Sequence, residues 1–190
     1  MKYIINLVLL FLIGLLAFML YSSIKEPVAF GNAKKYRKDI VVNKLQEIRT
    51  SQELYKSIKG EFAPSWEALI HTLKTDSIPL VKILEDENDS QKFEKFITYS
   101  SAFDSIKSLG LNLDSLSLIP FGKGKSFEIA ADTIEYQKTI VSVVEVGTKW
   151  KNFMGKYADI KYSKYDNKYD PNSTIKFGNM NKPNLSGNWE

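Results

Sequence analysis

The sequence predicts an α+β protein in which an N-terminal transmembrane helix leads into a long amphipathic helix packed on a small antiparallel β-sheet. Three observations support this fold class. An apolar run fills the N-terminus, apolar residues then recur every three or four positions up to Lys59, and strand-like runs follow Gly110. The prediction divides the chain into a transmembrane anchor (residues 1–24), a kinked juxtamembrane linker (25–33) and an α+β globular domain (34–190).

The N-terminal run has the length of a membrane span. No charged residue lies between Tyr3 and Ile24, and ~20 helical residues cross a hydrocarbon layer of about 30 Å. A cleaved signal peptide is the alternative, but its apolar run is usually about 7–15 residues and ends at small residues. Here the run is longer, and Tyr21 stands where a small residue is needed. A helix buried in a soluble fold is the remaining alternative. No second run of this length follows, so we expect a single-pass protein.

The charges flanking the span leave its orientation open. Only Lys2 precedes the span, whereas a basic cluster follows it: Lys25, Lys34, Lys35, Arg37 and Lys38. Counted directly, the positive-inside rule places the C-terminal part in the cytoplasm. Glu26 and Asp39 dilute the cluster, however, and several of its charges lie a helical turn or more beyond the span. Short basic N-terminal tails also commonly stay inside while the rest of the chain is exported.

A second helix is predicted from Asn32 to Lys59, after Pro27 and Gly31 have kinked or broken the first. Its apolar residues recur at helical spacing: Tyr36, Ile40, Val41, Leu45, Ile48, Leu54, Tyr55 and Ile58. This stripe is interpreted as the face that packs on the domain's own sheet. The alternative is a face that docks on a partner protein. Its contact residues would then be Tyr36, Ile40, Leu45 and Ile48.

The stretch "YKSIKGEFAPSWEALI" predicts a corner. Gly60 ends the long helix, and Phe62 turns inward. Pro64 and Ser65 begin a short helix, with Ser65 as its N-cap. The buried side of that helix is expected to hold Trp66, Leu69, Ile70 and Leu73.

The remaining elements are predicted from periodicity and turn residues. A short extended piece from Asp76 leads into an acidic loop at Glu85–Asp89. A helix follows over 91–110, with inward-facing Phe93, Phe96, Ile97, Phe103 and Ile106. Strands are expected at "DSLSLIPF" (114–121), "SFEIAADTIEY" (126–136), "TIVSVVEVG" (139–147) and "STIKF" (173–177), with a hairpin around "EYQKT".

Composition removes several kinds of chemistry. The chain has no cysteine and one histidine, which excludes disulfides, thiolate sites and multi-histidine metal sites. A net charge of +4, from 26 basic and 22 acidic residues, does not indicate a nucleic-acid partner. No catalytic residue is assigned, because no nucleophile and base stand in a recognisable pattern. No cofactor is expected either. A calcium site is the alternative to plain Asx turns for Asp166, Asn167, Asp170 and Asn172.

Lysine and tyrosine alternate from Lys156 to Tyr169. This pattern is typical of a half-buried edge strand whose lysines discourage edge pairing. The alternative is a ligand-binding surface on which Tyr162, Tyr165 and Tyr169 stack against sugars, bases or peptides.

The first ~70 residues resemble type IV pilins and pseudopilins, in which a helix ends near a tyrosine and a Gly-x-aromatic-x-Pro turn leads toward an antiparallel sheet. The matching residues are Leu54, Tyr55, Gly60, Phe62, Pro64, Trp66 and Leu69. The chain departs from the family at its N-terminus, where "KYIINLVLLF" replaces the processed Gly and Phe-Thr-Leu-x-Glu motif. The stretches "IKEPVAF", "FAPSWEAL", "SLSLIPF" and "SGNWE" are also similar to uncharacterised single-pass envelope proteins of Gram-negative bacteria.

These resemblances imply a non-catalytic, pilin- or pseudopilin-like subunit of a secretion, pilus or other envelope assembly. They imply a location in the bacterial inner membrane with the C-terminal domain in the periplasm. The expected partners are the membrane and other envelope proteins or further copies of the chain, and not nucleic acid. The alternative is a membrane-tethered module that binds glycan, peptide or calcium through the Tyr/Lys-rich C-terminal region, and an enzyme acting at the membrane surface is the third possibility.

Overall fold

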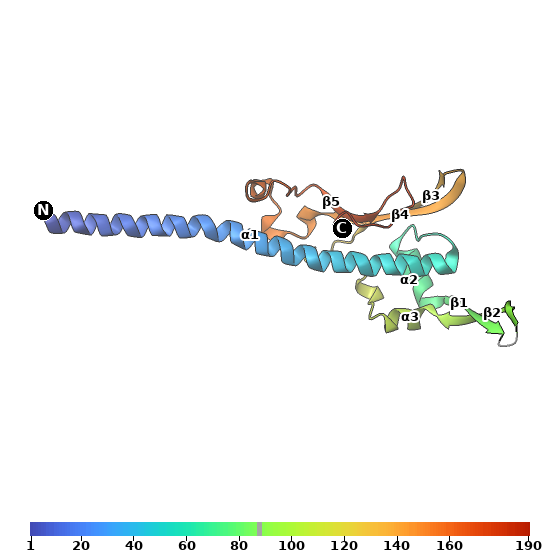
Figure 1. Cartoon of the computed structure of the whole chain (residues 1–190). Helices are drawn as coiled ribbons and strands as arrows, with labels where there is room; N and C mark the ends of the chain where they lie inside the picture. The colour runs from blue at the N-terminus through green and yellow to red at the C-terminus, as the bar shows by residue number, and fades with distance from the viewer. Residues whose placement is uncertain (87–88) are drawn as a thin grey trace.

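A single helix, α1, runs from Lys2 to Lys59 and forms the axis of the molecule (Figure 1). The computed structural model describes residues 1–86 and 89–190. Of the kink or break expected at Pro27 and Gly31, the break is wrong, because α1 continues through both residues, and the kink stays a prediction. Pro27 withholds one N–H from the helical ladder, which costs about 3 kcal/mol. The ladder continues on both sides of it, and Phe30, in the next turn, is anchored in the protein core. The division of the chain into anchor, linker and globular domain stays a prediction.

The two halves of α1 differ in burial. The apolar N-terminal stretch lies outside the core, with Leu10 75% and Phe11 70% exposed. In the C-terminal half, Val41, Leu45 and Ile48 are fully buried. The first half of α1 is long and apolar enough to span a membrane, as predicted.

The predicted corner is confirmed. Gly60 ends α1 with φ of 82°, and its N–H donates to the carbonyl of Lys56. The side chain of Ser65 accepts from the N–H of Ala68 and so caps α2 (Trp66–Thr75). Phe62 is buried below the turn. On α2, Leu69 and Leu73 are fully buried, whereas Trp66 and Ile70 are partly buried against the core.

The helix predicted over 91–110 is wrong in its first half. β1 (Ser77–Asp86) and β2 (Asp89–Ser101) form an antiparallel two-stranded hairpin, with Val81 opposite Ile97. The run Gln91–Ser101 contains Phe93, Phe96, Ile97 and Tyr99, which are residue types that favour strands, and it pairs with β1. Only α3 (Ala102–Ser108) is helical, and there Ile106 is buried while Phe103 is 46% exposed.

Two predictions concern residues of this hairpin that the structure describes only in part. The acidic loop is expected at residues 85–89. Of these, Glu85 and Asp86 end β1 and Asp89 begins β2, while residues 87 and 88 lie outside the described residues. The expected burial of Phe93, Phe96 and Ile97 concerns side chains outside those that the structure describes.

The second sheet has the order β3–β4–β5 and is antiparallel throughout. Its strands are β3 (Glu128–Tyr136), β4 (Thr139–Lys149) and β5 (Thr174–Gly178). The hairpin around "EYQKT" is confirmed: Gln137 and Lys138 link β3 to β4 with φ values of 49° and 65°. Positive φ at both positions is the geometry of the two-residue turn that matches strand twist.

The strand expected at 114–121 is not formed. Leu113–Ser115 is a short 3₁₀ helix, η1, and the chain then turns, with Leu118 bridging to Ser126. Leu113, Leu116 and Ile119 are buried. Their spacing of three suits a helical turn that plugs the core.

The edge strand expected between Lys156 and Tyr169 is also wrong. Two 3₁₀ helices occupy the region, η3 (Gly155–Tyr157) and η4 (Ile160–Tyr165), and a third, η2 (Trp150–Asn152), precedes it. Asp159 begins η4 by accepting the N–H of Lys161 at 2.9 Å. Since the tyrosines pack around one aromatic ring of α1, they do not alternate as they would in a strand.

The C-terminal half of α1 lies between the three-stranded sheet on one side and α2, α3 and the β1–β2 hairpin on the other (Figure 1). The apolar stripe of α1 joins the buried core, to which β4 contributes Val144 and Val146 and β5 contributes Ile175 and Phe177. The predicted mixture of helices and small antiparallel sheets, with a long apolar N-terminal helix, is therefore confirmed.

Candidate functional site

The junction between α1 and η4 is the most distinctive cluster of side chains in the molecule. Phe30, which is 2% exposed, lies at its centre. Its ring is 5.6 Å from that of Tyr162 and nearly parallel to it, at an interplanar angle of 9°. Tyr157 and Tyr169 meet the same ring edge-on, at centroid distances of 5.6 and 5.1 Å. Such aromatic pairs add to the stability that burial alone provides, so η4 is held firmly against α1.

The tyrosines of the predicted ligand surface are mostly part of this core. Tyr162 is 7% and Tyr169 is 2% exposed. The Tyr169 hydroxyl donates to the carbonyl of Tyr157 at 2.6 Å, and burial raises the pKa of Tyr169 to about 12. Tyr165 is half-buried, and its hydroxyl donates to the Glu26 carboxylate. The faces of Tyr162 and Tyr169 are thus used in packing against Phe30 and are not open to a ligand.

The residues of the predicted calcium site stabilise turns. Asp166 forms an ion pair with Lys34 and also accepts the N–H of Lys168. The contact with Lys34, foremost, lowers the pKa of Asp166. Asp170 accepts the N–H of Asn172 at 2.8 Å, and the Asn172 side chain accepts from Lys151 at 3.1 Å.

These contacts form Asx turns and salt links. Asn167 lies between them, exposed to solvent. Among the residues that the structure describes, no three His, Cys, Asp or Glu side chains gather as metal ligands would.

The four stripe residues predicted to bind a partner separate into two groups. Leu45 and Ile48 are fully buried in the core, and Ile40 is partly buried. Tyr36 is 62% exposed, with its ring 6.0 Å from that of Phe121. The stripe therefore serves mainly the domain's own core, and Tyr36 is the member that stays accessible.

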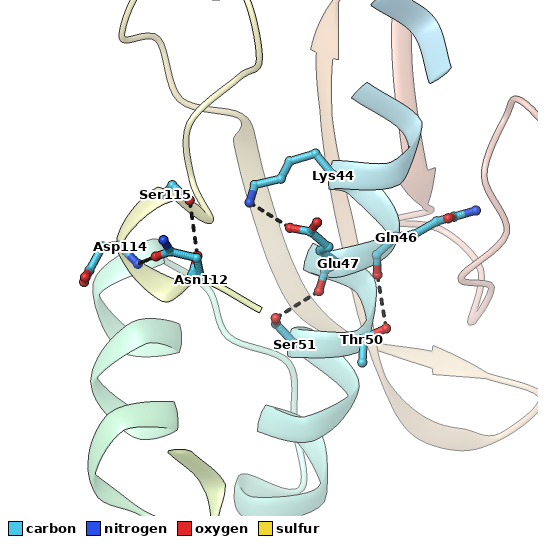
Figure 2. Close-up of polar contacts among 8 residues, drawn as sticks. All are labelled: Lys44, Gln46, Glu47, Thr50, Ser51, Asn112, Asp114 and Ser115. Atoms are coloured by element: carbon cyan, nitrogen blue, oxygen red, sulfur yellow. Dashed lines mark hydrogen bonds and ion pairs between the residues drawn. The ribbon is translucent and has the colours of Figure 1, made fainter. Parts of the chain in front are cut away.

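Polar side chains along the middle of α1 bond within their own element (Figure 2). Lys44 pairs with Glu47 at 2.7 Å, and the Ser51 hydroxyl donates to the Glu47 carbonyl at 2.9 Å. In the facing η1 turn, the Asn112 side chain accepts the N–H of Asp114 at 3.0 Å. These contacts satisfy helix and turn backbones, and the groups drawn do not combine a nucleophile with a base.

Sequence reasoning missed the role of Phe30 and the grooves beside it. One groove is lined by Phe18, Met19 and Ser23 of α1 together with Glu26, Lys164 and Tyr165. A second lies one to three turns further along α1, where Lys34, Lys35 and Lys38 face Tyr165 and Asp166. The signal in the sequence was a buried-type aromatic, Phe30, between two helix-breaking residues, which is unusual for a solvated linker.

The fold and this junction define a chain with one helix that is long and apolar enough to span a membrane and a mixed α+β domain built on the second half of that helix. No family model, curated protein or solved structure matches the chain.

Proposed function

We propose that this protein is a non-catalytic, single-pass membrane protein of pilin- or pseudopilin-like build. It acts as a structural or accessory subunit of a secretion, pilus or other envelope assembly. It lies in the bacterial inner membrane, with the globular domain on the periplasmic side.

One observation carries the proposal: a single helix is exposed and apolar in its first half and buried in the domain in its second half. Leu7, Leu10 and Phe11 are each at least 70% exposed. Apolar surface of this extent is unstable in water, at ~25 cal/mol per Å², and is stable in lipid or against another apolar helix. An exposed patch of this size marks a membrane or a protein interface.

The corner between α1 and α2 supports the pilin-like part of the proposal. Gly60 stops the helix, and Phe62 and Ala63 fold under it into the core. The chain then continues into helices and antiparallel strands around the same helix. The resemblance in sequence and this arrangement point to the same type of subunit.

The departure from the prepilin motif shapes the proposal. The span has no acidic residue between Tyr3 and Ile24. We therefore expect the span to stay uncleaved and to meet its neighbours through apolar contacts and not through a buried charge. The binding-module alternative has no comparable support, because Tyr162 and Tyr169 pack in the core.

The test combines topology with co-purification. A reporter that is active only outside the cytoplasm, fused after Glu190, should be active in cells and should fractionate with membranes. The matched control lacks residues 1–24 and should stay inactive. A cytoplasmic reporter signal from the full chain would overturn the periplasmic placement.

For the assembly role, the tagged chain is solubilised at native expression and compared with a variant whose residues 1–24 are replaced by an unrelated apolar span. We expect partner proteins or further copies of the chain to co-purify with the native chain and not with the variant whose span is replaced. Recovery of only a monomer with both chains would contradict the assembly role.

A further inference from the structure

We propose that η4 is a membrane-contacting face, in which Ile160 enters the headgroup layer and Lys161 and Lys164 bind the headgroups of anionic phospholipids. The inference rests on the proposed membrane anchoring. It adds a second, peripheral contact between the globular domain and the bilayer that sets how the domain stands on the membrane.

The position of η4 along α1 is the first argument. The apolar stretch ends at Ile24, and Glu26 follows two residues later. The Tyr165 hydroxyl donates to Glu26, and Lys164 Nζ lies 4.0 Å from the same carboxylate. At 1.5 Å of rise per residue, Glu26 is about 3 Å beyond the end of the span. The headgroup layer is roughly 5–7 Å thick on each side of the bilayer, so the end of η4 lies within it.

The groove beside the span is the second argument. Lys164 and Tyr165 share it with Phe18, Met19 and Ser23, which belong to the last turns of the apolar stretch. Side chains with an apolar body and a polar tip, such as lysine and tyrosine, are stable at that depth, because the tip reaches the headgroups. Part of η4 is therefore level with the outer end of the span and not merely above it.

The exposed side chains of η4 have the chemistry of such a contact. Ile160 is 57% exposed at the start of the helix. The Nζ atoms of Lys161 and Lys164 lie over the rings of Tyr162 and Tyr165, at 5.1 and 4.5 Å, and both lysines are exposed. Lys25, also exposed, adds a third positive charge at this level.

Two carboxylates, Glu26 and Asp159, also lie here and accept hydrogen bonds from neighbouring groups of the protein. Lys25, Lys161 and Lys164 outnumber them by one, so the face is weakly basic, with one apolar residue at its edge. Each lysine close to a membrane surface adds ~1 kcal/mol of attraction to anionic lipid. Packing of Tyr162 on Phe30 holds this face in a fixed position along α1.

Ile140 provides a contrast within the same chain. It is 77% exposed, but it follows the β3–β4 turn at the end of the molecule remote from the N-terminus (Figure 1). An exposed isoleucine is not in itself a membrane contact. The proposal singles out Ile160 because it belongs to η4, whose Lys164 and Tyr165 lie beside the end of the span.

The absence of cysteine allows the test to use single introduced thiols. The full chain is prepared as Leu10→Cys, Ile160→Cys or Ile140→Cys, spin-labelled, and placed in nanodiscs of phosphatidylcholine and phosphatidylglycerol in equal parts. Relaxation by a water-soluble nickel complex and by oxygen then measures the depth of each label. We expect the Leu10 label to be in hydrocarbon, the Ile160 label in the headgroup layer and the Ile140 label in water.

The three labels separate the two hypotheses. A Leu10 label in lipid with an Ile160 label as accessible to nickel as the Ile140 label would overturn the η4 contact and leave the anchor intact. A Leu10 label in water would overturn the anchor, and the η4 contact would fall with it. Helical circular dichroism of each labelled chain checks that it is folded.

A second measurement tests the charge. The pair of substitutions Lys161→Glu and Lys164→Glu, made in the Ile160→Cys chain, should raise the nickel accessibility of the label on the mixed nanodiscs. The matched control is Lys107→Glu, an exposed lysine on α3, and should leave accessibility unchanged. Equal accessibility in the double variant and its parent would show that headgroup charge is not recognised, and would overturn that part of the proposal.

Discussion

The side-chain amide of Gln52 forms two hydrogen bonds with the backbone of Ala63. Its Oε1 accepts the Ala63 N–H at 2.9 Å, and its Nε2 donates to the Ala63 carbonyl at 3.2 Å. Both residues are fully buried. The turn after Gly60 is therefore tied back to α1 by one polar side chain, which satisfies both backbone groups of Ala63 where water cannot reach them.

Replacement of Gln52 by leucine should destabilise the domain by about 2–4 kcal/mol, because two buried backbone groups lose their partner. Denaturant unfolding of the detergent-solubilised chain measures the change. The control, Gln46→Leu, alters an exposed glutamine on the same helix and should have little effect. Equal stability of the Gln52→Leu and Gln46→Leu chains would show that the corner does not depend on this bond pair.

Replacement of Phe30 by alanine should cost about 3–5 kcal/mol, the range for removing a buried aromatic ring. It should also free η4 from α1, because Tyr157, Tyr162 and Tyr169 all contact that ring. Faster proteolysis between Trp150 and Asn172 would report the release. Phe103→Ala, at a residue that is 46% exposed, is the matched control and should behave as the native chain. An unchanged digestion pattern in Phe30→Ala would contradict the central role of this residue.

The Lys34–Asp166 pair predicts a loss of stability in acid. Since the pair lowers the pKa of Asp166 below 3.8, its contribution is present above about pH 4 and disappears as pH falls through the lowered value. The carboxylate is partly exposed, so the contribution is at most ~1 kcal/mol.

Asp166→Asn keeps the oxygen that accepts the Lys168 N–H and removes only the charge. It should be less stable than the native chain at neutral pH, with the difference closing as the acid range is entered. Asp132→Asn, at an exposed position on β3, controls for the loss of one negative charge. If the difference in unfolding free energy between the native chain and Asp166→Asn stays constant with pH, the ion pair is contradicted.

Tyr169 predicts a loss of stability in alkali. Burial raises its pKa to about 12 in the folded chain, so the unfolded chain ionises first, near pH 10. The native chain should therefore lose up to about 3 kcal/mol relative to Tyr169→Phe between those values.

At neutral pH the native chain should be the more stable of the two, because Tyr169→Phe lacks the hydrogen bond to the Tyr157 carbonyl, worth ~1 kcal/mol. Thermal unfolding at a series of pH values measures both effects. Tyr99→Phe, at a residue that is 70% exposed, should follow the native profile. If the stability of all three chains changes with pH in the same way, the pKa of Tyr169 is not raised by folding.

The elements predicted correctly are those whose signals are local. Gly60 and Ser65 lie where a left-handed cap and an N-cap are required, and Gln137–Lys138 join two runs that contain several β-branched residues. The misplaced elements depend on contacts from far along the chain. β2 is a strand because β1 pairs with it, and the tyrosines after Gly155 curl around Phe30, more than 120 residues earlier. Periodicity within a window carries no information about such partners.

The candidate site shows the same limit. The alternation of tyrosine and lysine predicted an edge strand, with a ligand-binding surface of Tyr162, Tyr165 and Tyr169 as the alternative. It could not reveal that an aromatic ring of α1 fills the space between them. Likewise, Pro27 and Gly31 predicted a joint, but packing of Phe30 in the intervening turn outweighs the one hydrogen bond that proline removes.

The continuity of α1 through Pro27 and Gly31 has a mechanical consequence. Lys25–Lys59 of α1 extends about 50 Å beyond the span as one rod. If the bilayer tilts the span by ~20°, a common angle for membrane helices, the far end of that rod moves sideways by roughly 18 Å. Local bilayer thickness would in this way steer where the α1–α2 corner is found, with no rearrangement inside the domain itself.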